Sequence, residues 1–271
     1  CAWIAKRGLG DEVLGDVDAL ALLASGKPQY LELVRDHAKK VAPRDLALED
    51  GPGMKAWAWG WTNLFLAEYH LATHDDSVLP ALREYSQHIA RGQSGVGTWG
   101  HGMALPNEER SLGGYGALNQ AGLGCWLSLV LAREAGVKDP VVDGAIETAR
   151  GFFAFFVEKG SIPYGDHPPF WELHDNNGKN AQAAVAFDAL GDVGPARFFA
   201  RMTTASYDER ELGHTGNFFG YLWGPLGVAV AGRDALAAHL EELRWSFDLA
   251  RRWDGGFTAN PVLPADRQIV G

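Results

Sequence analysis

Polar side chains that can do chemistry gather in four stretches of this sequence, and one stretch is unusually dense. Residues 174–180 read HDNNGKN and place an imidazole, a carboxylate, three amides and an amine within seven positions. Burying such groups without hydrogen-bond partners is costly, so they do not serve to fill an apolar core. Positioned imidazoles, carboxylates and amines are the groups that enzymes use to transfer protons. We therefore predict that this stretch forms one wall of a polar pocket.

The other polar stretches supply groups suited to acid–base chemistry on a uronate sugar. In a β-elimination, an amide neutralises the substrate carboxylate, a histidine or tyrosine takes the C5 proton, and a tyrosine returns a proton to the leaving oxygen. His214 and Tyr221 are seven residues apart, a spacing that places them on one face of a helix. The catalytic candidates are His214, Tyr221, Asn217, His174, Asp175 and Asp166.

A second set of polar and aromatic residues is predicted to hold the substrate. Aromatic rings suit stacking on sugar rings, amides hydrogen-bond to hydroxyls, and a cation such as Lys179 or Arg110 would pair with a uronate. The alternative is structural, because Asn and Asp at helix starts commonly cap the helix and tryptophans commonly fill cores. The substrate-binding candidates are Trp99, His101, Tyr115, Asn119, Gln120, His167, Asn176, Asn177, Lys179, Asn180 and Trp223.

Two other chemistries would use some of the same residues. A glycoside hydrolase needs two carboxylates that flank the scissile bond. The candidates for that pair are Asp166, Asp175, Glu108 and Glu109. Zinc or another divalent metal would bind to imidazoles and carboxylates; the available ones are His101, His167, His174, His214, Asp166 and Asp175. The sequence has no HExxH motif, so we assign no metal ligand and expect no cofactor.

Composition argues against several classes of partner. The chain of 271 residues has a formal net charge of −10 and no basic cluster, so we expect no nucleic-acid partner. It contains no run of about 18 apolar residues, so we expect no membrane span. Two cysteines, Cys1 and Cys125, make no disulfide framework, and Cys125 lies in an apolar stretch typical of a core thiol. We expect a small-molecule or oligosaccharide substrate and, for a glycan, a periplasmic or extracellular location.

Five helical hairpins must position the candidate residues. Each hairpin has an apolar first helix, a short polar or glycine-containing turn, and an amphipathic second helix. The first helices around 119–136 and 217–232 are apolar nearly all round, which predicts burial on every side. Buried inner helices alternating with amphipathic outer ones predict an all-α fold, an α/α toroid. Five pairs are visible where closure in this class usually takes six, so we expect an incomplete barrel. The predicted turns are 24–30, 72–78, 134–140, 189–195 and 230–236.

The connections between hairpins are long and predict where the site lies. Loops longer than about 12 residues in a compact domain are usually functional. In an alternating ring they all emerge at one rim, so we expect the candidates to meet in one funnel at the N-terminal ends of the inner helices. The domain is predicted to span 1–257, followed by an irregular tail over 258–271. The long connections are 42–54, 92–113, 159–177 and 205–213.

Glycine–aromatic turns provide a family resemblance. The segments VGTWGHG, GSIPYGDHP and WDGGFTANP each follow an outer helix. They resemble turns of the superfamily of terpenoid cyclases and protein prenyltransferases. The stretches GTWGHG, LGGYGALNQAGL, IPYGDHPP, HDNNGKN and HTGNFFGYLWGPLG are similar to an uncharacterised bacterial family of that superfamily, classed as a domain of unknown function. The resemblance covers roughly residues 1–257 and implies an α/α toroid with additional domains in the parent chain.

The resemblance does not supply a reaction. The DxDD motif of triterpene cyclases is absent, and no Asp-x-Cys follows DGGF as in the zinc site of prenyltransferases. Lanthipeptide-type cyclases bind zinc with two cysteines and a histidine, and we do not expect Cys1 to meet Cys125. A terpenoid-cyclase-like toroid and a non-catalytic peptide-binding scaffold remain the alternatives to a carbohydrate enzyme.

Overall fold

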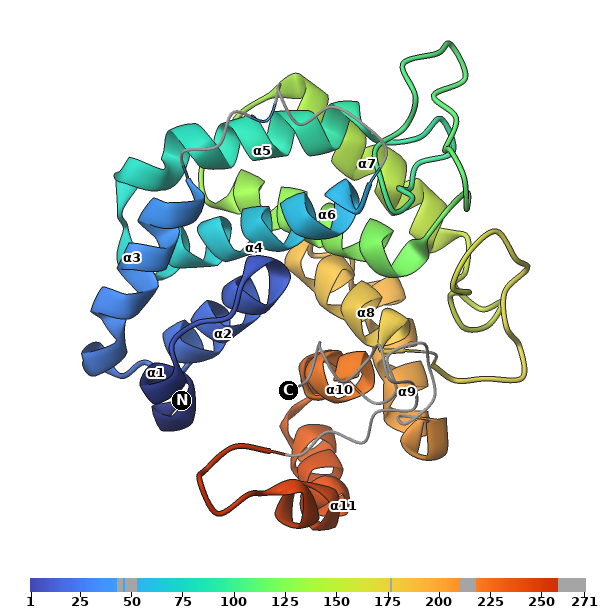
Figure 1. Cartoon of the computed structure of the whole chain (residues 1–271). Helices are drawn as coiled ribbons and strands as arrows, with labels where there is room; N and C mark the ends of the chain where they lie inside the picture. The colour runs from blue at the N-terminus through green and yellow to red at the C-terminus, as the bar shows by residue number, and fades with distance from the viewer. Residues whose placement is uncertain (43–45, 47–52, 176, 210–217, 258–271) are drawn as a thin grey trace. The chain divides into compact units, whose positions relative to one another are not determined.

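The computed structural model describes residues 1–271 apart from 43–45, 47–52, 176, 210–217 and 258–271 (Figure 1). Its described residues are all-helical, which confirms the predicted fold class. The extended pairings among them are two isolated bridges, Ser161–Phe170 and Arg251–Phe257. The chain divides into two compact units, Cys1–Ala149 and Arg150–Gly271. No helix in the described ranges has the length and apolar character needed to cross a membrane.

The first unit holds α1 and the helices of the first three hairpins, and α7 continues into the second unit. Unit 1 contains α1 (Ala2–Arg7), α2 (Glu12–Ala24), η1 (Pro28–Tyr30), α3 (Leu31–Val41), α4 (Lys55–Thr73), η3 (Asp76–Val78), α5 (Leu79–Arg91), α6 (Asn119–Glu134) and most of α7 (Pro140–Ala154). Unit 2 contains α8 (Lys179–Ala189), α9 (Val193–Ala205), η4 (Tyr207–Glu209), α10 (Phe218–Val230) and α11 (Arg233–Ala250).

The five predicted hairpin turns are confirmed. They join α2 to α3, α4 to α5, α6 to α7, α8 to α9, and α10 to α11. Gly26, Gly136 and Gly191 adopt positive φ in these turns, as glycines that end helices commonly do. Closure of the hairpins into a toroid and the single domain over 1–257 stay predictions.

First helices of successive hairpins pack closely against one another within each unit. In unit 1, α4 packs against both α2 and α6, and in unit 2, α8 packs against α10. A Cβ atom added to Gly60 of α4 would lie 3.3 Å from Cys125 Sγ, and one added to Gly227 of α10 would lie 2.5 Å from Ala181 Cα. The glycines in these apolar helices therefore allow backbones to approach where a larger residue would not fit.

The predicted burial of the apolar helices holds for one of them and is wrong for the other. In α6, Leu123, Cys125 and Trp126 point in different directions and are all fully buried. In α10, Leu226 is 49% exposed. Within unit 2, α10 packs mainly against α8, α9 and α11. None of these helices covers the side of α10 that carries Leu226.

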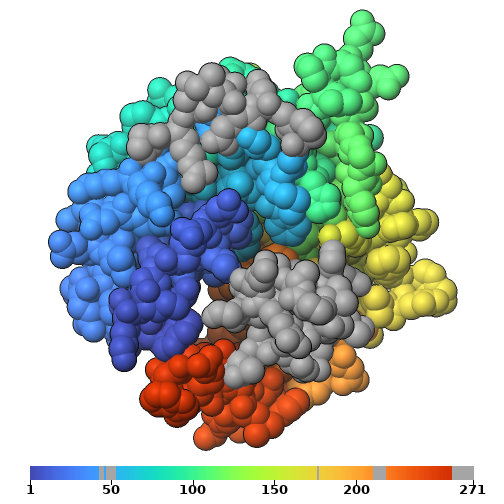
Figure 2. Space-filling model, in the orientation of Figure 1, coloured from blue at the N-terminus to red at the C-terminus, as the bar shows by residue number. Residues whose placement is uncertain are grey.

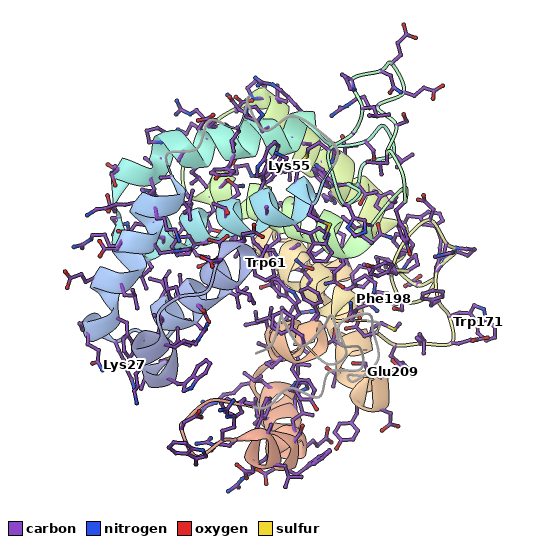
Figure 3. All side chains as sticks on the ribbon, in the orientation of Figure 1. Lys27, Lys55, Trp61, Trp171, Phe198 and Glu209 are labelled. Carbon is purple, nitrogen blue, oxygen red and sulfur yellow. The ribbon has the colours of Figure 1, made fainter. Side chains whose placement is uncertain are left out.

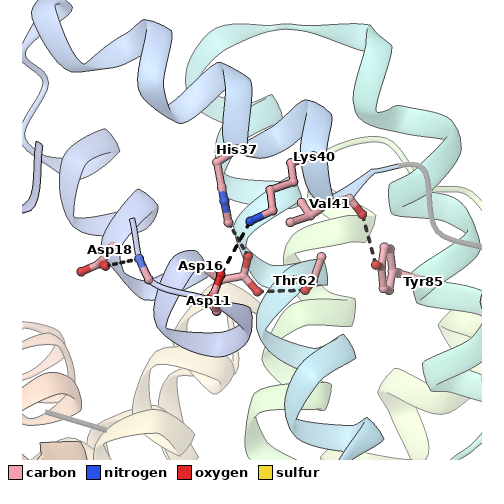
Figure 4. A network of polar contacts seen from close by, with 9 residues as sticks. Asp11, Asp16, Asp18, His37, Lys40, Val41, Thr62 and Tyr85 are labelled. Carbon is pink, nitrogen blue, oxygen red and sulfur yellow. Dashed lines mark hydrogen bonds and ion pairs between the residues drawn. The ribbon is translucent and has the colours of Figure 1, made fainter. Parts of the chain in front are cut away.

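A buried polar network ties three helices of unit 1 together (Figure 4). His37 Nε2 on α3 donates a hydrogen bond to Asp16 Oδ1 on α2 at 2.9 Å, and Thr62 Oγ1 on α4 donates to Asp16 Oδ2 at 2.8 Å. Asp16 is 1% exposed. A carboxylate withdrawn from water needs such partners, and here both of its oxygens have one. Asp16 therefore fixes how α2 meets the neighbouring helices.

We predict that Asp16→Ala lowers the free energy of unfolding by about 3 kcal/mol or more. It leaves His37 and Thr62 as buried polar groups without this acceptor, at about 1–3 kcal/mol each. Asp11→Ala is the control, because the Asp11–Lys40 ion pair is largely exposed and such pairs contribute about 1 kcal/mol or less. Urea unfolding followed by circular dichroism measures both, and equal effects of the two substitutions would contradict the assigned role of Asp16.

Candidate active site

Glu209 holds the start of the HDNNGKN turn, which leads into α8. Its Oε2 accepts hydrogen bonds from the backbone N–H groups of His174 (2.7 Å) and Asp175 (2.9 Å). Its Oε1 lies 3.1 Å from His174 Nδ1. Glu209 belongs to η4, in the connection that follows α9, and is labelled in Figure 3. Two of the long loops therefore meet within unit 2, while the convergence of all four on one rim stays a prediction.

Asp175 and Asn180 close the same turn by bonding to the backbone. Asp175 Oδ1 accepts a hydrogen bond from the Asn180 backbone N–H at 3.0 Å, in the first turn of α8. The Asn180 side chain donates to the His174 carbonyl at 2.6 Å and accepts from the Ile162 N–H at 3.0 Å. Asp175 and Asn180 therefore have a structural role: they bond to the backbone at the start of a helix, which was the alternative to a role in catalysis or substrate binding.

Gly178 sets the turn directly against α10. Its φ is +71°, and a Cβ there would lie 2.5 Å from the Phe219 carbonyl oxygen and 3.1 Å from Trp223 Cβ. Only glycine fits this combination of a left-handed backbone and a close approach. The turn therefore brings the candidate Trp223, which is 4% exposed, beside the start of α8.

Lys179 is the residue of this turn whose chemistry the fold changes most. It is the first residue of α8 and is completely buried. Its Nζ lies 5.7 Å from the centroid of the Tyr164 ring. Burial lowers the pKa of Lys179 from its ordinary 10.5 to about 7, while the negative charge of Asp175 acts in the opposite direction. Near neutral pH a large share of this amine is therefore unprotonated and can accept a proton.

Buried polar atoms without a hydrogen-bond partner lie on both sides of Lys179 in the sequence. They are Asn177 Oδ1 in the turn and Gln182 Oε1, one helical turn further along α8. Asn177 is 2% exposed and Gln182 is 1% exposed. Ser161 Oγ, in the loop that carries Tyr164, is a third such atom. Buried polar groups are rarely left unpaired, and the two amide oxygens are acceptors that a hydroxyl group would satisfy.

The remaining unit 2 candidates are placed differently. Asp166 and His167 are exposed in the loop closed by the Ser161–Phe170 bridge, and His167 stacks on Phe170 at 6.3 Å. Tyr221 contacts α11, where its hydroxyl lies 2.9 Å from Ser246 Oγ. Three candidates, Asn176, His214 and Asn217, lie outside the described residues.

The unit 1 candidates divide into an aromatic cluster and buried core residues. Trp57 Nε1 at the start of α4 donates to His101 Nδ1 at 3.0 Å, and the His101 ring meets the edge of Tyr115 at 5.7 Å. Tyr115 is 62% exposed, so this cluster offers an aromatic surface. Trp99 is completely buried and donates to the Ile89 carbonyl at 2.8 Å, which places it in the core and away from any sugar.

Asn119 and Gln120 begin α6 and are both buried. Thr98 Oγ1 donates to Asn119 Oδ1 at 3.3 Å, so Asn119 anchors the preceding loop. Both side-chain polar atoms of Gln120 are without a hydrogen-bond partner. Polar residues thus stand at the N-terminal ends of α6 and α8, while the common funnel expected from the sequence stays a prediction. Among the residues with described positions, no group of three or more His, Cys, Asp or Glu side chains could hold a metal ion.

Sequence reasoning missed three residues of the unit 2 site. Glu209 lies in a short acidic segment with no motif, and its role depends on a contact across 35 positions of the chain. Ser161 and Gln182 are the two ends of the polar stretch 161–182, but neither was among the predicted site residues. A polar residue at position i+3 from Lys179 on a helix was the one available signal for Gln182.

Comparison with known proteins places the chain in a family. A family model described as a domain of unknown function, DUF6288, matches residues 1–267. The chain belongs to the DUF6288 family. No curated protein and no solved structure matches it. The resemblance to a domain of unknown function is therefore confirmed for nearly the whole chain, and the family description supplies no reaction.

For this DUF6288 domain we predict that Lys179→Met makes the fold more stable than the wild type, by a margin that grows as pH falls toward 7. The unfolded chain keeps the ordinary pKa of 10.5, whereas the folded state releases the proton near pH 7, so wild-type stability declines from high pH toward pH 7. The Lys179→Met variant has no buried amine, so its stability does not decline for this reason. Its stability relative to wild type should rise by up to about 1.4 kcal/mol per unit of decreasing pH and become constant below about pH 7.

Thermal and urea unfolding at several pH values measure this difference. Lys159→Met is the matched control in unit 2, because Lys159 is exposed and its replacement removes no buried amine. We expect a pH-independent difference for the control. A Lys179→Met variant that is less stable than wild type at pH 6 would show that Lys179 is retained as a structural charge.

Proposed function

We propose that this domain is an enzyme that acts on a carbohydrate, cleaving a uronate-containing chain by β-elimination with Lys179 as the base. The observation that carries the proposal is the completely buried amine of Lys179, within the HDNNGKN turn, with a pKa of about 7. A general base is most effective when its pKa is near the working pH. This assigns to Lys179 the proton abstraction that the sequence suggested for His214 or Tyr221.

The proposed reaction follows from the groups around Lys179. The neutral amine takes the C5 proton of the uronate, and the electron pair left on C5 forms the C4–C5 double bond as the C4–O bond breaks. Tyr164, whose ring lies 5.7 Å from Nζ, is the hydroxyl that would return a proton to the leaving oxygen. The unpaired amide oxygens of Asn177 and Gln182 would accept hydrogen bonds from substrate hydroxyls.

Substrate contact with Lys179 requires the loop that carries Tyr164 to move, since the lysine is fully buried. This loop is closed at its base by the two hydrogen bonds between Ser161 and Phe170, at 2.7 and 3.0 Å. Trp171, immediately after the loop, is 81% exposed and extends away from the helices (Figure 3). We propose that the loop opens to admit the sugar and that the indole offers a surface for stacking on it.

The elimination is better supported than hydrolysis by a carboxylate pair. Asp175 and Glu209 accept backbone hydrogen bonds within the turn, and Asp166 is exposed. Neither arrangement resembles two carboxylates facing a scissile bond. The alternating hairpins and the sequence resemblance support a further proposal, that the domain is a bacterial α/α toroid related to terpenoid cyclases. A terpenoid-cyclase-like or peptide-binding role is the alternative if sugars are not substrates.

The test is an assay of the purified domain on a panel of uronate-containing polysaccharides. A lyase product has a conjugated double bond, so ultraviolet absorbance should rise with at least one substrate. We expect Lys179→Met to reduce kcat/KM by about 10²–10⁴-fold. In the wild type, kcat/KM should increase as pH rises through about 7, where Lys179 loses its proton.

Lys179→Arg separates a base from a cation that neutralises the substrate carboxylate. Arginine keeps the charge but does not accept a proton, so the variant should be inactive if Lys179 is the base. Retained activity in Lys179→Arg, or activity that falls as pH rises through 7, would assign the cation role. New reducing ends without absorbance would indicate a hydrolase, and no cleavage of any uronate polymer would refute the proposed function.

A further inference from the structure

A pocket of about 330 Å³ opens in unit 1 between the end of α5, the first half of α7 and the loop that joins α5 to α6. Its volume lies at the lower end of the range of about 300–1,000 Å³ typical of small-molecule sites. Part of the loop, in green, projects from the molecular surface in Figure 2. None of the pocket residues belongs to the Lys179 site, which lies in unit 2.

Two arginines line this pocket, and the loop fixes one of them in place. Arg110 Nη2 donates to the carbonyl oxygens of Ala90 (3.2 Å) and Arg91 (2.6 Å), the last carbonyls of α5. The Arg110 backbone is fixed as well, because its carbonyl accepts from the Gly95 N–H at 3.2 Å. The guanidinium is therefore held at the backbone carbonyls of Ala90 and Arg91, with no carboxylate partner among the residues that the structure describes.

Arg91 gives the pocket a second positive charge. Its side chain is exposed, and within the described residues neither Arg91 nor Arg110 forms an ion pair. The adjacent Asp139 accepts from Gln87 Nε2 at 2.7 Å and from the Val141 N–H at 2.8 Å. These hydrogen bonds, with a smaller contribution from the charge of Arg91, lower the pKa of Asp139, and it forms no ion pair with Arg91. The residues lining the pocket include no acidic side chain. Two guanidinium groups in a concave site favour an anion.

The opposite wall of the pocket is apolar. It is formed by Pro140, Val141 and Ala145 on α7, with Gly144 between them. A ligand that fits both walls has a planar anionic group for the guanidinium and a small apolar body for α7. We propose that this pocket binds a small organic carboxylate, with Arg91 and Arg110 pairing the carboxylate and α7 contacting the apolar part. This site is independent of the proposed function, and either can fail without the other.

Ligand-observed NMR with benzoate, and with benzamide as its neutral counterpart, tests the proposal on the whole chain. We expect benzoate to bind and benzamide to bind at least about tenfold more weakly. Arg91→Gln should weaken benzoate binding by about tenfold or more, the usual effect of losing a hydrogen bond to a charged group. Equal binding of benzoate and benzamide, or no effect of Arg91→Gln, would overturn the proposal.

A pocket-filling substitution provides an independent test that does not alter charge. A Cβ at Gly144 meets no atom within 4 Å, so Gly144→Leu can extend into the pocket without backbone strain. Gly151→Leu is the matched control, because Gly151 is also on α7 with open space at its Cβ but does not line the pocket. We expect loss of benzoate binding only for Gly144→Leu. Unchanged benzoate binding in Gly144→Leu would show that benzoate binds outside this pocket and would overturn the proposal. Displacement of benzoate by equimolar inorganic phosphate would show that the pocket does not prefer carboxylates, and would also overturn it.

Discussion

Burial within the first turn of an inner helix, as at Ala56 of α4 and Asn180 of α8, is the constraint on which this structure depends. The first turn of a helix presents N–H groups that have no acceptor within the helix. At α4 the His101 carbonyl accepts from the Ala56 N–H at 3.0 Å, and at α8 Asp175 accepts from the Asn180 N–H. The partners come from the long connections, which must run from an outer helix to the buried end of the next inner one. This requirement explains why polar residues concentrate where the loops meet the inner helices.

The hydrogen bonds at the start of α8 also allow Lys179 to be buried, and this burial lowers the pKa of its amine. Glu209 and Asp175 satisfy the backbone of the turn, and the turn then holds the lysine in a dry environment. A buried ammonium is unfavourable, so the fold keeps a group that lowers its own stability near neutral pH. Natural proteins retain such costs mainly at sites of function. The Asp16 network in unit 1 is different, because there each buried polar group has a partner and the result is stability alone.

The two proposed sites handle positive charge in opposite ways. In unit 2 the amine of Lys179 is fully withdrawn from water and tends to lose its proton. In unit 1, Arg91 and Arg110 line an open pocket and keep their charge, because a guanidinium does not lose its proton in proteins. The first arrangement suits proton transfer and the second suits recognition of an anion. The DUF6288 family model spans both units.

The sequence by itself determined the all-α class and the five hairpin turns, because these follow from local periodicity and from glycine and proline near helix ends. It could not separate Lys179, the proposed base, from the residues of HDNNGKN that close the turn. That distinction depends on Glu209, which reaches His174 and Asp175 from a distant loop, and on the packing that buries Lys179. Tertiary structure also decided that Trp99 fills the core and that one side of α10 stays open at Leu226. The burial and the pKa of a side chain depend on residues from elsewhere in the chain, and the local sequence does not determine which residues those are.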